Sequence, residues 1–469
     1  MRHLNLFSIL SVPSLVLFAA GCSSGNSVGH TAQTITFDNP GTQTVGAPLT
    51  LSATANSGLT VSFTSATPSI CTVSGTTATF EAAGTCTIDA NLAGDSTYAA
   101  ASQVAQSFTV NPAIGSTTTV YIAGFAISTA SSTSNIVTVA EKWQLTSGSP
   151  TATATALPMP SGMTSSQANA IAVSGSDVYV VGSASTSTSQ TAVYWLNNGA
   201  ATTLPPSSGM AYSDANAIAV AGGNVYVAGW VWSSAGNGTA AYWVNGAVTT
   251  LSPPSGMAYS DAAAITVSGS NVYVVGTAWN NNSDESAVLW VNGAATLLPM
   301  PSGLTGDYYA DGIAVSGGDV YVSGYTDSNA DYDTAIYWVN NGAATTLPIP
   351  AGMIYDEYTA NGIAVSGSDV YVAGGGQTGP GSGTAAYWEN GTPTTLPMPS
   401  DMTDSPAASY AAGITVTGSD VYAVGSVQDS TIRVANTAAY WVNSGEATLL
   451  PMPSGTDESW ASAIAVATQ

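Results

Sequence analysis

Hydrophobic and polar residues alternate along most of the chain in short runs, and a period of two is typical of β-strands. In AIAVSGSDVYVVG, which starts at Ala170, two such runs are joined by small residues before an Asp, as a tight hairpin requires. Two further runs, TAVYWLNNG and AATTLP, complete the unit, and Asn-Gly joins the equivalent runs at 245–246. The pattern predicts four antiparallel strands per unit and no helix, so the fold class is all-β.

The four-strand unit recurs through most of the chain. A Val-Tyr-hydrophobic-X-Gly motif returns at spacings of 58, 47, 47, 48, 50 and 51 residues, the length of one β-propeller blade. One Trp falls on the third strand of each unit, and we expect it to pack between blades. The motif begins at Val120, Val178, Val225, Val272, Val320, Val370 and Val421, and the Trp residues are Trp143, Trp195, Trp243, Trp290, Trp338, Trp388 and Trp441.

The two ends of the repeat region complement each other. The segment from Thr118 has no AIAV-like first strand, whereas SAIAVATQ at 462–469 is a first strand without a unit of its own. Residues 118–469 are therefore predicted to form a seven-bladed β-propeller, in which 462–467 complete blade 1. Such closure removes the unpaired edges of an open array. The six complete units start at Ala170, Ala217, Ala264, Gly312, Gly362 and Gly413.

A second β domain precedes the repeat. Between 33 and 112 the chain has short alternating runs such as TITF, LTLSATA and TCTIDANL, separated by Gly, Pro, Asn and Ser. This pattern predicts a small β-sandwich, followed by a linker at 113–117. The wording QTITFDNPGTQTVGAPLTLSATANSGL and CTVSGTTATFEAAGTCTI resembles bacterial immunoglobulin-like (Ig-like) repeats of surface proteins, which implies a spacer. No Trp lies between the two Cys, so the core of an antibody domain is not expected.

The N-terminus has the features of a secretory signal: Arg2, then an apolar run, then small residues before Cys22. The sequence FAAGC at 18–22 resembles the lipobox of bacterial lipoproteins. The resemblance implies a signal peptide at 1–21, lipid on Cys22, a linker at 22–32 and attachment to the outer membrane or cell surface. The alternative is an ordinary signal peptide with an incidental Cys. Lipidation of one of the three Cys leaves Cys71 and Cys86 as a disulfide pair.

The repeat wording DVYVAG followed by TAAYWENG, from Asp369, resembles VYVAG/YW-NG propeller repeats of bacterial secreted proteins. These proteins are mostly uncharacterised, so the resemblance implies the fold and adds little about function.

Charge and composition exclude several functions. The net charge is −24 with only three Lys and Arg residues, so nucleic acid is excluded as a partner, because phosphate binding needs clustered cations. An anionic lipid surface is disfavoured for the same reason. The repeat region has no His and no Cys, which excludes Ser-His-Asp and Cys-His catalysis and the usual zinc sites. Paired carboxylates remain available for glycoside hydrolysis.

Candidate ligand-binding residues lie between the second and third strands and between units. In a four-stranded meander these connections meet at one end of the sheet, and here they are long, aromatic and acidic. Aromatic rings with carboxylates suit a sugar or a protein ligand; the alternative is that the rings cover the blade ends while the acids maintain solubility. The candidates are Tyr212, Asp214, Trp230, Trp232, Tyr259, Asp261, Trp279, Tyr309, Asp311, Tyr358, Tyr410 and Trp460.

One connection also has the spacing of a calcium loop. In DSNADYDTA, oxygen-bearing side chains alternate, as at the start of an EF-hand, although Tyr332 stands where an EF-hand needs Gly. A looser Ca²⁺ site at Asp327, Asn329, Asp331 and Asp333 is the one cofactor expected. Overall, the sequence predicts a surface-anchored binding or adhesion lipoprotein without enzymatic activity. A structural envelope component is the alternative, and a carboxylate-dependent glycoside hydrolase is less favoured.

Overall fold

The computed structural model describes residues 30–111, 118–128, 137–146, 151–328, 332–350, 353, 358–379, 382–400, 402, 407–429 and 433–468. Every regular element in these residues is a β-strand, as the alternating pattern predicts. In this part of the chain there is no helix of the length and hydrophobicity that crossing a bilayer requires. Cys22 and the segments 1–21 and 113–117 lie outside the described residues.

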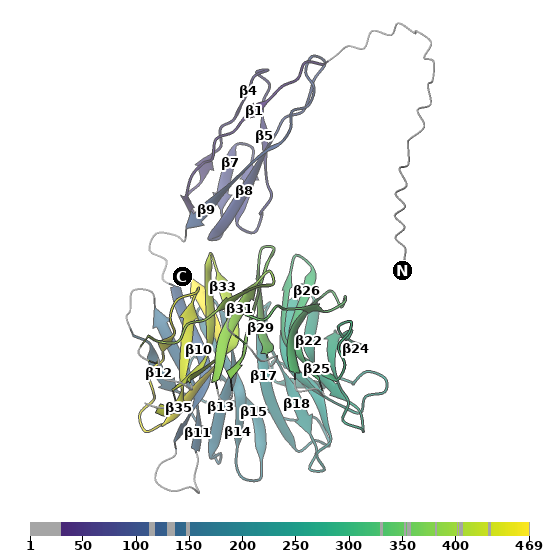
Figure 1. Ribbon diagram of the computed structural model, residues 1–469, viewed down its shortest axis with the longest axis vertical. Helices are drawn as coiled ribbons and strands as arrows, with labels where there is room; N and C mark the ends of the chain where they lie inside the picture. Colours follow the sequence, from purple (N-terminus) through teal and green to yellow (C-terminus); the bar gives the residue numbers. More distant parts are fainter. Residues whose placement is uncertain are drawn as a thin grey trace, which may run out of the picture.

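Strands β1–β9 form a group of their own at one end of the molecule (Figure 1). Their sheets have the orders β2-β9-β8-β5, β3-β7-β6 and β1-β4. The strands are β1 (Ile35–Thr36), β2 (Gln43–Thr44), β3 (Leu49–Thr50), β4 (Thr54–Ala55), β5 (Ser62–Ser65), β6 (Cys71–Ser74), β7 (Thr77–Phe80), β8 (Gly84–Asn91) and β9 (Val104–Asn111).

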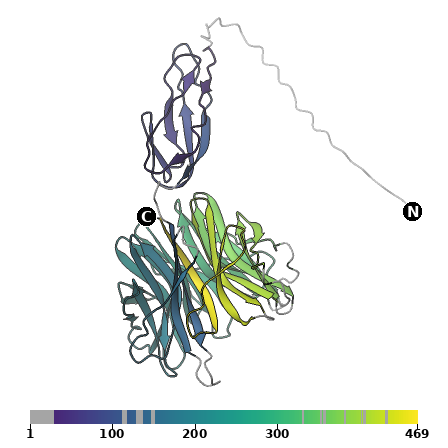
Figure 2. The same cartoon turned by 90° about the vertical axis from the view of Figure 1, so that its left-hand side faces the viewer.

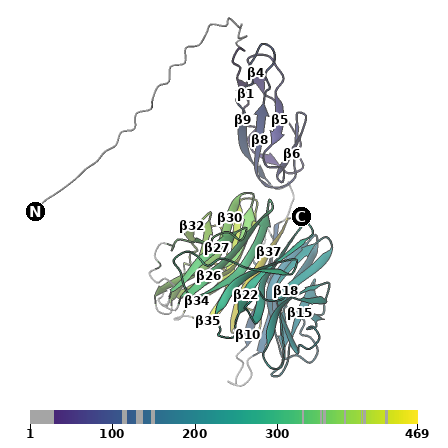
Figure 3. The ribbon, with the colours of Figure 1, turned by 90° about the vertical axis from the view of Figure 1, so that its right-hand side faces the viewer.

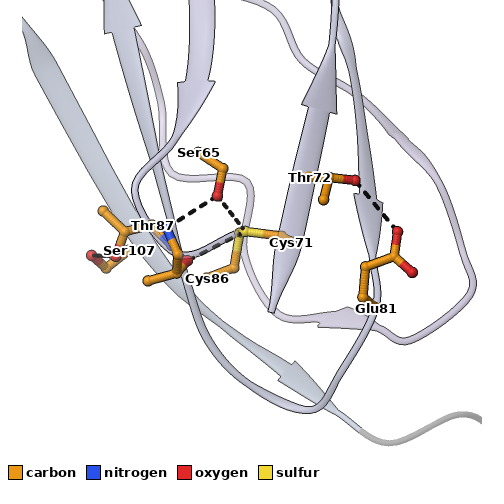
Figure 4. Close-up of a disulfide and its surroundings, with 8 residues drawn as sticks. Ser65, Cys71, Thr72, Glu81, Cys86, Thr87 and Ser107 are labelled. Carbon is orange, nitrogen blue, oxygen red and sulfur yellow. Dashed lines mark hydrogen bonds between the residues drawn. A yellow bond between two sulfur atoms is a disulfide. The ribbon is translucent and has the colours of Figure 1, made fainter. Parts of the chain in front are cut away.

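A disulfide between Cys71 and Cys86 lies in the core of this group, as the cysteine count predicts (Figure 4). It joins β6 to β8, which belong to two different sheets, and both Cys residues are fully buried. The surrounding core includes Phe80 and Phe108, whose rings meet edge to face with centroids 5.9 Å apart. The covalent link therefore holds the two sheets together across their shared core.

The rest of the described chain forms seven four-stranded antiparallel sheets. In sheets 2 to 7 the strands follow one another in sequence order, and sheet 1 has the order β12-β11-β10-β37. Sheet 1 contains β10 (Thr118–Ser128), β11 (Val137–Thr146), β12 (Thr153–Ala156) and β37 (Glu458–Thr468); sheet 2 contains β13 (Ser165–Ser174), β14 (Asp177–Ser185), β15 (Gln190–Leu196) and β16 (Thr202–Leu204); sheet 3 contains β17 (Tyr212–Ala221), β18 (Asn224–Trp232), β19 (Gly238–Val244) and β20 (Ala247–Thr250). Sheet 4 contains β21 (Tyr259–Ser268), β22 (Asn271–Trp279), β23 (Glu285–Val291) and β24 (Ala294–Leu297); sheet 5 contains β25 (Asp307–Ser316), β26 (Asp319–Ser328), β27 (Tyr332–Val339) and β28 (Thr345–Thr346); sheet 6 contains β29 (Tyr358–Ser366), β30 (Asp369–Gly379), β31 (Ser382–Glu389) and β32 (Thr392–Thr395); sheet 7 contains β33 (Ala407–Thr417), β34 (Asp420–Asp429), β35 (Arg433–Val442) and β36 (Thr448–Leu449).

Sheet 1 combines the two ends of the repeat region. The C-terminal strand β37 pairs antiparallel with β10, with Ile464 opposite Ile122. In Figures 2 and 3 the C-terminal strand lies beside the first strands of the repeat. The first strands β37, β13, β17, β21, β25, β29 and β33 contact one another in an unbroken circle. The unfinished repeat at the C-terminus therefore supplies the strand that the first unit lacks.

The predicted role of the third-strand Trp residues is confirmed. All seven are fully buried, and each indole Nε1 donates a hydrogen bond to a backbone carbonyl that follows the last strand of the preceding sheet. The bond from Trp143 in sheet 1 reaches Pro451, after sheet 7, so the contacts pass through the chain ends as well. The other bonds are Trp195 to Pro158, Trp243 to Pro205, Trp290 to Ser252, Trp338 to Pro299, Trp388 to Pro348 and Trp441 to Pro397, and all seven measure 2.8–3.0 Å.

The first strand of each of the seven sheets has a β-bulge at the corresponding position. In β17 the register with β18 shifts between Ala215 and Ala217, which leaves Asn216 as the extra residue. A bulge leaves one residue out of the ladder and redirects its side chain. The extra residues are Asn169, Asn216, Ala263, Asp311, Asn361, Ala412 and Ser462.

Candidate ligand-binding site

The connections within each sheet fall at two different ends. Asn245 and Gly246, with φ of 49° and 87°, form the tight third turn of sheet 3, because these residue types adopt positive φ at low cost. At the opposite end, Tyr212 at the start of β17 pairs with Trp232, and Trp232 pairs with Gly238 across the second connection. We call this second end, where the longer connections meet, the loop face.

All twelve predicted ligand-binding residues lie at the loop-face end of the sheets, but within strands and not in loops. The first strands begin about five residues earlier than the alternating pattern indicates, since the pattern is interrupted at the bulge. In β17, for example, Tyr212 and Asp214 precede the bulge at Asn216 and still pair with Trp232 and Trp230. Their backbones are therefore fixed by the sheet.

The aromatic candidates form separate stacks within their own sheets. In sheet 3 the rings of Trp230 and Trp232 stack with centroids 4.2 Å apart, and Tyr212 lies 5.4 Å from Trp232. Gly238 accommodates this stack, because a Cβ there would lie 2.9 Å from Trp230 Cε3. The remaining stacks are Tyr259 with Trp279 at 5.9 Å, Tyr309 with Tyr325 at 4.8 Å, and Trp460 with Phe125 at 5.0 Å.

Tyr358 does not lie on the surface. Its side chain is only 6% exposed, and its hydroxyl donates to the Leu347 carbonyl at 3.0 Å in the core between sheets 5 and 6. Most other sheets have Ser at this position of the first strand. In sheet 3, for example, Ser213 accepts a hydrogen bond from the Ala192 N–H of the preceding sheet. Tyr358 therefore replaces an inter-sheet Ser contact, and we leave it out of the candidate site.

The three candidate Asp side chains are withdrawn from solvent. Asp214 accepts a hydrogen bond from Gln190 Nε2 at 2.6 Å, and Asp261 accepts one from the Thr277 N–H at 3.0 Å. Burial raises the pKa of each of these carboxyls to about 6. Burial also raises the pKa of Asp311 to about 7, and the nearby charge of Asp261 acts in the same direction. Of the three, Asp214 contacts a neighbouring sheet through Gln190, and the bond of Asp261 lies within its own sheet.

Tyr410 is the most exposed of the twelve, at 47%, and it lines a cavity of about 300 Å³ at the loop face. The cavity lies among sheets 5, 6 and 7, and its volume is at the lower end of the range for small-molecule sites. Its lining residues are Asp333, Thr359, Gly375, Gly376, Gln377, Gly383, Ala408, Ser409, Tyr410, Ser426 and Asn436.

The cavity arises from a missing side chain. Asp214 pairs with Trp230 and Tyr309 with Tyr325, whereas the corresponding pair of sheet 6 is Thr359 with Gly375. Small residues in sheet 6 therefore leave space where sheets 1, 3 and 5 place large rings. The corresponding pairs of sheets 1, 2, 4 and 7 are Trp460 with Phe125, Gln167 with Ser183, Asp261 with Thr277, and Tyr410 with Ser426.

Glycine at 375 is also required by the backbone. A Cβ there would lie 2.6 Å from the Thr384 carbonyl oxygen of the neighbouring strand. At Gly383, by contrast, a Cβ would meet Ser409 O at 3.4 Å, an ordinary contact, so a side chain at 383 is tolerated and would occupy the cavity. Sequence reasoning found Tyr410 but missed Gln377 and Asn436. The signal was GGG at 374–376, where sheet 3 has GWV.

The predicted calcium loop is only partly described. Asn329 and Asp331 lie outside the described residues, while Asp327 and Asp333 face each other as a cross-strand pair of β26 and β27. Within the residues that the structure describes, no group of three or more His, Cys, Asp or Glu side chains is arranged to hold a metal ion. The calcium site stays a prediction.

Comparison with known proteins gave matches to solved structures at low similarity. No family model and no curated protein matches it. YjhT is 12% identical, with 63% of this chain and 99% of that chain covered and a TM-score of 0.36. A subtype N11 neuraminidase-like protein of A/flat-faced bat/Peru is 13% identical, with 63% and 92% covered and a TM-score of 0.38. The β-propeller domain of the Trilobed protease from Pyrococcus furiosus is 10% identical, with 71% and 94% covered and a TM-score of 0.40. The described part of this chain is all-β, and one of the structures it resembles is a β-propeller domain.

Proposed function

We propose that sheets 1 to 7 are the blades of a seven-bladed β-propeller and that β1–β9 form an Ig-like spacer. The circle of first strands and the Trp bond across the chain ends support the blade count. Two sheets joined through a buried disulfide support the sandwich. With a signal peptide at 1–21 and lipid on Cys22, the spacer would hold the propeller away from an outer-membrane or cell-surface anchor.

The propeller is proposed to bind a glycan at the cavity beside Tyr410. The observation that carries this proposal is a half-exposed Tyr ring on a cavity whose other lining residues are Ala408 and residues that bring Gly backbone, hydroxyl, amide and carboxylate groups. A sugar packs its C–H face on an aromatic ring, while its hydroxyls bond to groups such as Asp333, Gln377 and Asn436. The chain has only three Lys and Arg residues, and none of the lining residues is one of them, which favours a neutral or amino sugar over an acidic one.

Binding without catalysis fits the same cavity. Glycoside hydrolysis needs two carboxyl groups flanking one bond, and Asp333 is the single carboxylate among the described lining residues. A structural envelope component without a discrete ligand remains the alternative. It predicts no saturable binding, and it assigns no role to the small residues of sheet 6.

The test is a glycan array probed with the chain from Gly29 onward, with calcium and with chelator. For a glycan that binds, we expect Tyr410→Ala to raise the dissociation constant about tenfold, which corresponds to ~1.4 kcal/mol of lost contact. Gly383→Val should abolish binding by filling the cavity.

Tyr212→Ala is the matched control, since it removes the same residue type from the same face in sheet 3. Unchanged binding in this control, with loss in the cavity variants, would support the proposal. Equal loss in both would move the site to the aromatic stacks. Absence of binding to every neutral and amino glycan would favour the structural alternative.

A further inference from the structure

Three of the bulge residues make the same hydrogen bond to the next sheet. Each is an Asn whose side-chain Nδ2 donates to the backbone carbonyl of the residue just before the next bulge. Such a bond ties adjacent first strands together on the inside of the circle. The bonds run from Asn169 to Ala215, from Asn216 to Ala262 and from Asn361 to Ala411, and each measures 2.9 Å.

In sheet 5 the bulge residue is Asp311. By the same rule its acceptor is the carbonyl of Ala360, just before the bulge residue Asn361 of sheet 6. The two strands come close here, since a Cβ on Gly312 would lie 3.1 Å from the Ile363 nitrogen, and between sheets 6 and 7 a Cβ on Gly362 would lie 3.3 Å from the Ala412 oxygen. An ionised carboxylate has no proton to donate, so it would place a negative charge against a carbonyl oxygen.

The surroundings of the Asp311 carboxyl also favour its protonated form. Its Oδ2 is buried and accepts no hydrogen bond. Asp311 interacts electrostatically with three titratable groups: Asp261 on β21, Tyr325 on β26 and Tyr410 on β33. None of these supplies a positive charge. Lys142 lies over the Tyr121 ring in sheet 1, 5.5 Å from its centroid. A buried carboxyl without a cation or a donor is stabilised by taking up a proton.

We propose that Asp311 is a proton-binding site, in which the carboxylic acid O–H donates to the Ala360 carbonyl and substitutes for the Asn of the other sheets. The proton would give the buried Oδ2, which has no partner when ionised, a hydrogen bond to donate. Ionisation at higher pH would replace the bond by repulsion between sheets 5 and 6, next to the cavity. This inference does not depend on the glycan proposal, because it concerns stability alone.

The pH dependence follows from the direction of the shift. Burial raises the pKa of Asp311 from the ordinary Asp value of about 4 to about 7. A raised acid pKa means that the folded state binds the proton more tightly, so the stabilisation is present at low pH and is lost between about pH 4 and about pH 7. Asn at this position donates at every pH.

The experiment compares melting temperatures of the wild type and Asp311→Asn from pH 4.5 to 8.5. We expect nearly equal values at pH 4.5 and a variant that melts at least about 4 °C higher at pH 8.5. Glu446→Gln, at an exposed position of sheet 7, is the control for the loss of one negative charge. A difference between Asp311→Asn and wild type that stays constant with pH, or that favours the wild type at pH 8.5, would overturn the proposal.

The reciprocal variant is Asn361→Asp, which places the same acid at the bulge of sheet 6. It should melt close to the wild type at pH 4.5 and below it at pH 8.5, so a folded sample at low pH is available for comparison. A pH-independent Asn361→Asp would also contradict the proposal. Carboxyl ¹³C shifts of Asp-labelled protein provide a direct readout: one resonance, absent from Asp311→Asn, should titrate near pH 7.

Discussion

If the circle of sheets is closed in solution, Trp143 should contribute to the stability of the fold. This side chain is fully buried between sheets 7 and 1, and its Nε1 donates to the Pro451 carbonyl at 3.0 Å, 308 residues away in sequence. Trp243 makes the equivalent bond to Pro205 at 2.9 Å within the interior of the array. In a closed circle, the Trp143 contact across the chain ends should contribute as much to the free energy of unfolding as the Trp243 contact in the interior.

The expected loss in the free energy of unfolding follows from the groups that the substitution Trp143→Phe removes. Trp143→Phe eliminates the N–H donor and with it the hydrogen bond to Pro451, whose net contribution is about 0.5–1.5 kcal/mol because Pro451 is exposed and water can replace the donor. The smaller ring also leaves part of the core unfilled, for roughly 1 kcal/mol more. We therefore expect a loss of about 1.5–2.5 kcal/mol for Trp143→Phe, and the same within ~1 kcal/mol for Trp243→Phe.

Urea unfolding followed by far-ultraviolet circular dichroism measures both variants against the wild type, with the slope m checked for constancy. Equal losses would support a closed ring. The reasoning would be refuted if Trp243→Phe lost stability as expected while Trp143→Phe unfolded at the wild-type midpoint. In that case the chain ends would separate in solution and β37 would contribute no stability.

Two further predictions concern buried groups. Replacing Cys71 and Cys86 together by Ala removes a link across 15 residues and should cost β1–β9 about 3 kcal/mol, with hydrogen exchange accelerated in β8 and unchanged in sheets 2 to 7; unchanged exchange in β8 would contradict this. Glu141 is 1% exposed where sheet 2 has Val193, its Oε2 has no hydrogen-bond partner, and burial raises its pKa to about 7. Its folded-state pKa is raised, so its contribution to stability falls from about pH 4.5 to about pH 7, and Glu141→Val should exceed the wild-type urea midpoint at pH 8 by a margin that shrinks towards pH 4.5. A margin independent of pH would count against this account.

The candidate site was only half predictable from the sequence. The pattern placed aromatic and acidic residues at one end of the sheets, which is correct, but it placed them in loops. The bulge at Asn216 and its equivalents shifts the two-residue period, so the pattern started each first strand about five residues too late along the chain. As a result Tyr358 was assigned to the surface, although its ring lies in the core.

The cavity illustrates the opposite limitation. Nothing in the sequence marks Gly375 and Gly383 as functional residues. Their role is recognised only when Gly375 is compared with Trp230, which occupies the corresponding position of sheet 3. The space that they leave depends on three sheets meeting at one place, and neighbouring sheets bring Asp333, Gln377 and Asn436 together from distant positions. Residues that form a hollow by being small cannot be recognised without their neighbours.

The sequence by itself determined the strands, their grouping in fours and the pairing of the two chain ends, because these depend on local alternation and on a repeat that is visible in one dimension. It also determined which Trp residues are buried, since one falls on the third strand of every unit. Only the tertiary structure decided which side chains reach solvent, where the cavity opens and which carboxyls lack a partner. Those properties depend on contacts between sheets: Asn361 donates to the Ala411 carbonyl of the next sheet, whereas the buried Oδ2 of Asp311, at the same position of sheet 5, has no hydrogen-bond partner.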